Sequence, residues 1–221
     1  MSPHRITKKE MKQDKFVTYS LKVSEWIQKH LNEVLMGTGG VILVGVILFF
    51  IFSSQAKREQ KAADLLGKAN LELQGGNIGE AMGSLQTLMN KYGSTKSAGR
   101  ASFLLASAHF YAKDYVQAQS LFEEYLEKHK EDILLAASAQ AGIAECHMQR
   151  ENFIPAGENF VKAASLSPQS FLAPQYLLQA ALAYLKADQK EKAREVLKRL
   201  ISEYPDSREV HQAKLQLAEN F

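Results

Sequence analysis

The sequence predicts an all-α protein in which one transmembrane helix near the N-terminus precedes a solenoid of stacked helical hairpins. Two observations predict this fold. Residues 34–56 are mostly apolar and carry no charged side chain, and residues 62–205 repeat one pattern of small and large apolar residues at intervals of 37 or 38. An uncharged run of this length is typical of a membrane span, and a period of about 20–50 residues indicates stacked structural units.

The apolar run is long enough to cross a bilayer. Its core, residues 41–52, reads VILVGVILFFIF. A helix rises about 1.5 Å per residue, so roughly 20 residues cross the hydrocarbon layer. Thirteen Val, Leu, Ile and Phe residues lie between positions 34 and 52. Each favours insertion by about 0.3–0.6 kcal/mol, so we expect residues 34–56 to form a single-pass anchor in the lipid bilayer.

A cleaved signal peptide is the alternative to an anchor. Ser54-Gln55-Ala56 fits loosely the small-x-small pattern of a cleavage site. However, 33 residues precede the apolar run, and the run exceeds the usual apolar core of a signal peptide. These features favour an uncleaved anchor.

The charge is distributed unevenly along the chain. Residues 1–33 carry seven Lys or Arg against four Asp or Glu, whereas the remainder carries 20 of each sign. A neutral domain lacks the basic surface that phosphate groups require, so we expect no nucleic-acid partner. The basic tail favours a cytoplasmic N-terminus and an extracytoplasmic repeat domain, although four basic residues between positions 57 and 68 flank the other end of the span.

The segment before the span carries apolar side chains at helical spacing. Val23, Trp26 and Ile27 belong to this pattern in residues 16–33. It predicts either an amphipathic helix on the membrane surface or a simple extension of the spanning helix. The expected organisation is therefore a basic tail at residues 1–33, a span at 34–56 and a repeat domain at 57–221.

Four copies of one pattern make up the expected repeat domain. A small residue recurs in each first helix, an alanine recurs early in each second helix, and a large apolar residue follows four positions later. The three sets are Ala69, Ala106, Ala144 and Ala181; Ala81, Ala118, Ala156 and Ala193; and Leu85, Phe122, Phe160 and Leu197. Each set has intervals of 37, 38 and 37 residues. Alanines let two helices approach closely and the larger residue fills the space toward the next pair, which predicts four stacked helix pairs with one core.

Turn-forming residues separate the two helices of each expected pair. They are Gly75-Gly76-Asn77, Lys113-Asp114, Glu151-Asn152 and Asp188-Gln189. A further apolar set follows these turns, but its fourth member is Lys190, so we expect the fourth pair to pack more loosely. Pro168 and Pro205 close two units, and residues 208–220 are expected to form a last helix that covers the end of the stack.

This order of small residue, alanine, aromatic residue and proline is similar to the tetratricopeptide repeat. Each unit is three or four residues longer than the usual period of about 34, and the Trp and Gly of the first helix are missing. The whole layout, with Trp26-Ile27 in a charged tail, one span and a repeat domain, resembles the bacterial ancillary SecYEG-translocon subunit family. That resemblance implies an inner-membrane protein with a periplasmic repeat domain. It also implies partners among translocon components, periplasmic chaperones and unfolded exported chains.

A second resemblance leaves an alternative function open. Tyr92-Gly93-Ser94-Thr95 and Tyr204-Pro205-Asp206-Ser207 look like segments of the tetratricopeptide domains of outer-membrane assembly and cell-envelope coordination proteins. The implied alternative is a scaffold for outer-membrane biogenesis or cell division.

The sequence shows no motif of a catalytic, cofactor or metal site. It contains no P-loop, Gly-rich dinucleotide fingerprint, Gly-x-Ser-x-Gly elbow or His-Glu-x-x-His. Cys146 and His147 are adjacent, but neighbouring side chains on a helix point about 100° apart and cannot readily converge on one atom. We therefore expect a binding protein that is not an enzyme and holds no cofactor or metal.

The resemblance to tetratricopeptide proteins implies that the first helices line a concave face that binds partners. The candidate partner-binding residues on these helices are Asn70, Phe103, Phe110, Tyr111, Met148, Gln149 and Leu182. The surface they offer is mostly apolar and aromatic, which suits unfolded or amphipathic protein segments. The alternative is that part of this set belongs to the core, as apolar stripes at helical spacing usually do.

Overall fold

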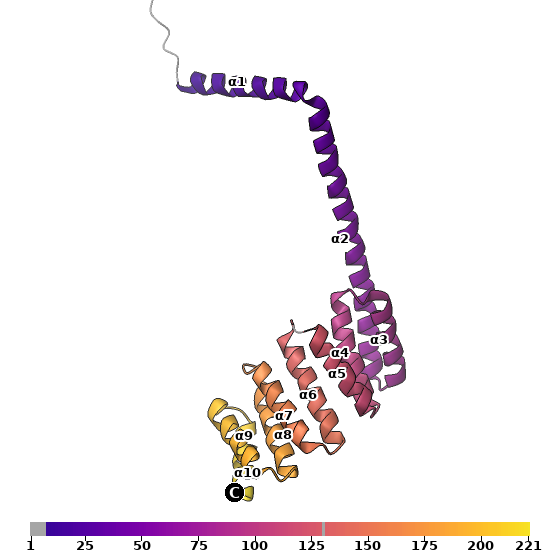
Figure 1. Ribbon diagram of the computed structural model, residues 1–221, viewed down its shortest axis with the longest axis vertical. Coiled ribbons are helices and arrows are strands. Elements are labelled where there is room, and N and C mark those ends of the chain that lie inside the picture. The colour runs from indigo at the N-terminus through magenta and orange to yellow at the C-terminus, as the bar shows by residue number, and fades with distance from the viewer. Residues whose placement is uncertain (1–7, 130) are drawn as a thin grey trace, which may run out of the picture. The chain divides into compact units, whose positions relative to one another are not determined.

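The structure, a computed structural model, describes residues 8–129 and 131–221. Regular secondary structure in these residues consists of ten α-helices and no strand (Figure 1). The predicted all-α fold is therefore confirmed. Contacts within the chain divide it into two units, which meet between Ala56 and Lys57.

The first unit holds α1 (Lys8–Lys29) and the apolar part of α2 (Leu31–Gln74). A turn at His30 separates the two helices. The His30 N–H donates to the Trp26 carbonyl at 3.0 Å, and the two rings stack with centroids 5.0 Å apart. A distinct helix thus precedes the apolar segment, instead of a simple extension of it, and this helix begins earlier than the predicted residue 16.

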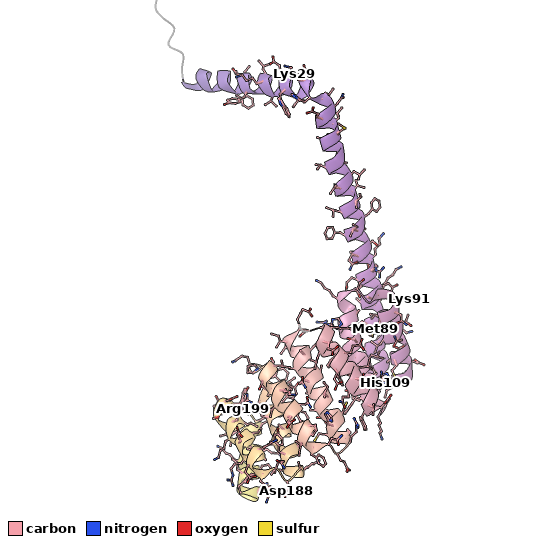
Figure 2. All side chains as sticks on the ribbon, in the orientation of Figure 1. Lys29, Met89, Lys91, His109, Asp188 and Arg199 are labelled. Atoms are coloured by element: carbon pink, nitrogen blue, oxygen red, sulfur yellow. The ribbon has the colours of Figure 1, made fainter. Side chains whose placement is uncertain are left out.

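α2 carries the apolar segment. In the part of the chain that the structure describes, it is the one helix long and apolar enough to cross a membrane. None of its most apolar stretch is buried within the protein. Figure 2 shows the side chains of this stretch projecting from the ribbon. A helix that is apolar on all sides is stable only when protein or lipid surrounds it.

The second unit is a stack of helix pairs. It contains the last part of α2 and the helices α3 (Ile78–Tyr92), α4 (Lys96–Tyr111), α5 (Tyr115–Lys128), α6 (Ile133–Gln149), α7 (Phe153–Leu166), α8 (Ala173–Lys186), α9 (Lys190–Glu203) and α10 (Glu209–Asn220). From α3 onward each helix packs against its neighbours in the chain, and α4 also contacts α6 (Figure 1). This arrangement is the predicted solenoid of helical hairpins, and α10 packs on α8 and α9 at its end.

The four turns within the pairs share one backbone geometry. Each contains a residue with left-handed φ: Gly76 (78°), Lys113 (64°), Glu151 (60°) and Asp188 (56°). The N–H of the following residue donates to a carbonyl five positions earlier at 2.8–2.9 Å, which is the Schellman ending of a helix. Figure 2 marks one such residue, Asp188, between α8 and α9. The turns predicted from sequence are therefore confirmed, and their left-handed residues recur at the repeat intervals.

The predicted repeat positions form the core. All eight alanines of the two small-residue sets are fully buried, and the four large apolar residues are at most 3% exposed. The expected looseness of the fourth pair is wrong. Lys190 is the first residue of α9 and lies exposed, whereas Leu177, Leu197 and Leu200 of the same pair are fully buried in one cluster. A lysine in the first turn of a helix can reach water without opening the core behind it.

The N-terminus of α4 is capped by a residue from α2. The Glu59 carboxylate accepts hydrogen bonds from the backbone N–H groups of Lys96 (2.8 Å) and Ser97 (3.1 Å) and from the Ser97 hydroxyl (2.6 Å). The N-cap residue Thr95 makes no side-chain cap, because its hydroxyl donates to the Tyr92 carbonyl. The bond from the Ser97 hydroxyl, helped by the two backbone bonds, lowers the pKa of Glu59 below its ordinary value of 4.5.

Candidate functional site

A groove crosses the first helices of three consecutive pairs. It has a volume of about 230 Å³, and α4, α6 and α8 each contribute a stripe of side chains, while α5 and α7 contribute one aromatic ring each. We call it the aromatic groove. Its lining residues are Phe103, Ser107, Phe110, Tyr111, Phe122, Ser138, Ala141, Gly142, Glu145, Phe160, Gln175, Tyr176 and Gln179.

Aromatic side chains form the α4 side of the aromatic groove. Phe103 contacts Phe122 and Tyr125, with centroids 5.6 and 5.7 Å apart. Phe110 meets Tyr111 edge-on, with centroids 6.1 Å apart. Phe103 and Phe110 are half-buried and pack against the core, whereas Tyr111 is 63% exposed. Part of this wall is therefore fixed by packing, and Tyr111 stands free to contact a partner.

The floor of the aromatic groove depends on a glycine. The Phe122 ring, which is 3% exposed, lies against the backbone of α6 at Gly142. A Cβ atom at position 142 would lie 2.6 Å from Cε2 and Cζ of that ring. Carbon atoms in favourable contact are about 3.5–4.0 Å apart, so only glycine lets the ring approach this closely.

Glu145 places one carboxylate in the aromatic groove. It is half-buried on α6 and follows Ser138, Ala141 and Gly142 along one face of that helix. Burial raises the pKa of its carboxyl, because the charged form loses hydration. On the facing helix α8, Gln175 and Gln179 supply amides that can donate and accept hydrogen bonds.

A second hollow lies beside the aromatic groove, and we call it the C-terminal hollow. Its volume is about 390 Å³, and it is lined by Met148, Gln179, Leu182, Leu185, Lys186, Gln216 and Asn220. Gln179 lines both hollows. The Lys186 ammonium lies 5.5 Å from the centre of the Phe153 ring, within the range of a cation–π contact.

Five of the seven candidate residues predicted from sequence line these hollows. Phe103, Phe110 and Tyr111 line the aromatic groove, while Met148 and Leu182 line the C-terminal hollow. Four of the five, all except Tyr111, also pack against core clusters. A residue of this set can therefore line a hollow and belong to the edge of the core at once.

The other two candidates, Asn70 and Gln149, line neither hollow. The Asn70 amide donates to the Leu66 carbonyl of its own helix at 3.0 Å. Gln149 lies exposed as the last residue of α6.

Sequence reasoning missed several lining residues. Tyr176, Gln175 and Gln179 were not among the candidates, although they lie on α8, one of the helices expected to bind partners. Gln216 and Asn220 lie on α10, which was expected only to cover the end of the stack. The one available signal was Gly142, because a glycine inside a helical pattern often marks a close approach of another group.

Comparison with known proteins identifies the repeat. A sequence family described as a tetratricopeptide repeat-like domain matches residues 25–175, which is more than half of the chain. The chain belongs to this tetratricopeptide repeat-like family. A tetratricopeptide repeat also matches residues 175–207, so the two matches together run from α1 to the end of α9. No protein of curated function matches the sequence significantly.

Solved structures share the tetratricopeptide fold of this chain. The MamA protein superposes with a TM-score of 0.54 at 17% identity, covering 64% of this chain and 72% of MamA. The apo form of RapI gives a TM-score of 0.61 at 14% identity, covering 74% of this chain and 64% of RapI. At such identities the likeness concerns the fold alone.

The adjacent Cys146 and His147 of the tetratricopeptide domain lie in a packed environment. Cys146 is fully buried, and burial raises the pKa of its thiol to about 12. Burial also lowers the pKa of His147, whose Nδ1 is buried without a hydrogen-bond partner. Within residues 16–33, 35–129 and 131–221, whose side chains the structure describes, no group of three His, Cys, Asp or Glu side chains could hold a metal ion.

Proposed function

We propose that this protein is a membrane-anchored adaptor whose tetratricopeptide domain binds other proteins. In this proposal residues 1–33 are a basic tail, residues 34–56 cross the bilayer, and residues 57–221 form the binding domain. The observation that carries it is the combination, in one chain, of a helix that is apolar on all sides with a repeat domain that presents an aromatic groove. The family match begins at residue 25, before the apolar segment, so the family model includes this segment together with the repeats.

The dimensions of the aromatic groove favour a protein segment over a small-molecule substrate. Its volume of about 230 Å³ is below the roughly 300–1,000 Å³ of typical small-molecule pockets. Exposed aromatic side chains such as Tyr111 are typical anchors of protein interfaces. Tetratricopeptide proteins are generally non-catalytic interaction scaffolds, which supports a binding role and not an enzymatic one.

The finer part of the proposal rests on the resemblance to the ancillary SecYEG-translocon subunit family. It assigns the chain to the inner membrane as a single-pass protein with the tetratricopeptide domain in the periplasm. The basic residues of the tail support this orientation, because cytoplasmic flanks are rich in Lys and Arg. The proposed partners are translocon components, periplasmic chaperones and unfolded exported chains.

Site-specific photocrosslinking tests the partners. A photoreactive amino acid at Tyr111, which is exposed in the aromatic groove, should capture translocon components or periplasmic chaperones in intact cells. The matched control is Val116, which is 64% exposed on α5 and does not line the groove. Identical adduct patterns at the two positions would contradict binding in the groove. Adducts with division or outer-membrane assembly proteins would favour the alternative scaffold function.

A reporter at the C-terminus tests the orientation. A fusion to alkaline phosphatase, which is active only in the periplasm, should be active, and a fusion to green fluorescent protein should be dark after export through the translocon. The opposite pattern would place the tetratricopeptide domain in the cytoplasm and refute the periplasmic part of the proposal.

A further inference from the structure

We propose that the aromatic groove binds a protein segment that inserts a lysine or arginine side chain among its rings, with the cation paired to the Glu145 carboxylate. This inference rests on the proposed function, because it specifies the chemistry of the segment that the same groove takes. The bound segment is expected to carry one basic residue in an otherwise apolar or neutral stretch.

The charge of the groove supports a cationic guest. Of the thirteen described residues that line it, Glu145 alone carries a formal charge at neutral pH; the others are aromatic, aliphatic or neutral polar residues and glycine. The side chains of residues 16–33, 35–129 and 131–221 make no hydrogen bond or ion pair to its carboxylate. A half-buried carboxylate without a partner is costly, and a bound cation would remove that cost.

Aromatic rings that line the same groove as the carboxylate supply the second half of the recognition. α4 places Phe103, Phe110 and Tyr111 along one side of the groove. On the other side, the buried Tyr176 of α8 has its hydroxyl 3.4 Å from that of Ser138, at the end of the α6 stripe opposite Glu145. The face of an aromatic ring attracts a cation within about 6 Å of its centre, and the attraction grows when water is excluded. The methylene groups of lysine or arginine would pack on these rings while the charged end reaches Glu145.

The groove is sized for a short extended segment. The α6 stripe extends from Ser138 to Glu145, seven steps along the helix, which corresponds to about 10 Å. An extended chain advances about 3.3 Å per residue, so the stripe accommodates roughly three residues. Gln175 and Gln179 line the same groove, and their amides can bond to the backbone of such a segment without selecting its side chains.

The neighbouring lysine of this chain is engaged elsewhere. Lys186 belongs to the C-terminal hollow, and its ammonium lies over the Phe153 ring. Its placement leaves the Glu145 carboxylate available to a cation from another protein.

Peptide binding to the full-length chain in detergent tests this inference. Three fluorescent nine-residue probes share an apolar and aromatic sequence and differ only at the central residue, which is lysine, norleucine or glutamate. By fluorescence anisotropy the lysine probe should bind about tenfold more tightly than the norleucine probe, since a hydrogen bond to a charged group contributes at least this much. The glutamate probe should bind most weakly.

Two variants locate the effect at Glu145. Glu145→Gln should abolish the preference for lysine over norleucine, because the variant has no charge to pair with the lysine ammonium. Glu145→Lys should reverse the order, so that the glutamate probe binds more tightly than the lysine probe. Glu127→Gln, an exposed glutamate on α5 outside the groove, should leave all three affinities unchanged. Thermal unfolding of each variant confirms that it is folded.

The outcomes separate this inference from the proposed function. Equal binding of the three probes to the wild-type chain, or an unchanged lysine preference in Glu145→Gln, overturns the role of Glu145 and leaves a protein-binding groove intact. Binding of none of the probes also overturns the inference, and the photocrosslinking at Tyr111 then decides independently whether the groove binds proteins.

Discussion

Replacing Gly142 by alanine tests how tightly the floor of the aromatic groove is packed. The new Cβ atom would lie 2.6 Å from two ring carbons of Phe122 and 2.9 Å from a third. A normal contact needs about 3.5–4.0 Å, so the ring or the helix must move by about 1 Å. Phe122 is 3% exposed and contacts Phe103, so its ring has little space to move into.

The expected magnitude combines two opposing effects. Overpacking of this kind costs about 1–3 kcal/mol. Alanine also favours a helix over glycine by roughly 0.8–1.0 kcal/mol. Gly83→Ala is the matched control, because Gly83 lies exposed inside α3 and a Cβ there meets no atom within 4 Å. Both variants gain the same helix propensity, so the difference between them isolates the steric effect at Gly142.

Thermal unfolding of the full-length chain in detergent, followed by circular dichroism, measures this difference. For a domain of this size about 1 kcal/mol shifts Tm by roughly 2–4 °C. Gly142→Ala should therefore melt about 2–12 °C below Gly83→Ala. In the double variant Gly142→Ala/Phe122→Leu the smaller side chain should recover part of the loss, as expected for residues in contact. Equal Tm values for the two alanine variants would refute the packing argument.

Three further predictions follow from the structure. Glu59→Gln should destabilise the domain by about 1 kcal/mol in urea unfolding, as expected for loss of a helix cap. Because folding lowers the pKa of Glu59, the stability that its carboxylate contributes is present above pH 4.5 and is lost as the pH falls through the folded value. A stability difference between wild type and Glu59→Gln that grows on acidification would contradict this capping role. Glu151→Gly should stabilise the domain by about 0.5–1 kcal/mol in the same assay, since glycine adopts the left-handed φ of 60° without strain. Gly76→Ala should destabilise the domain for the same reason, and two variants that both stabilise or both destabilise would be inconsistent with turn strain. Val46→Lys should impair membrane insertion by about 2.5–3.5 kcal/mol, seen as loss from the membrane fraction, and unchanged partitioning would argue against a span.

The repeat architecture could be predicted from the sequence because its determinants are local and periodic. An alanine where two helices cross and a large apolar residue four positions later are needed in every pair, so four copies revealed the period. The turns were equally visible, since residues such as Gly76 and Asp188 tolerate a left-handed φ better than most. The same reasoning wrongly predicted loose packing of the fourth pair from Lys190. The repeat pattern does not show that a side chain at a helix N-terminus can reach water.

The composition of the groove was less accessible to sequence reasoning. Each helix shows which of its own faces is apolar, but not which residues of the next helix stand opposite. Tyr111 could be nominated as a partner contact, whereas Gln179, which lines both hollows, could not. Asn70 was nominated from its register alone and lies outside both hollows, where its amide bonds to its own helix.

The sequence by itself determined the number of helix pairs, the positions of their turns and the presence of one uncharged apolar helix, because hydrophobic periodicity and turn chemistry act over a few residues. Only the tertiary structure decided that Glu145 lines one groove with rings from α4 and α8, that the Phe122 ring packs on Gly142, and that Glu59 caps a helix that begins 37 residues later. These contacts depend on how successive pairs rotate against one another. That rotation follows from the fit of many side chains at each interface and not from the residues of any single repeat.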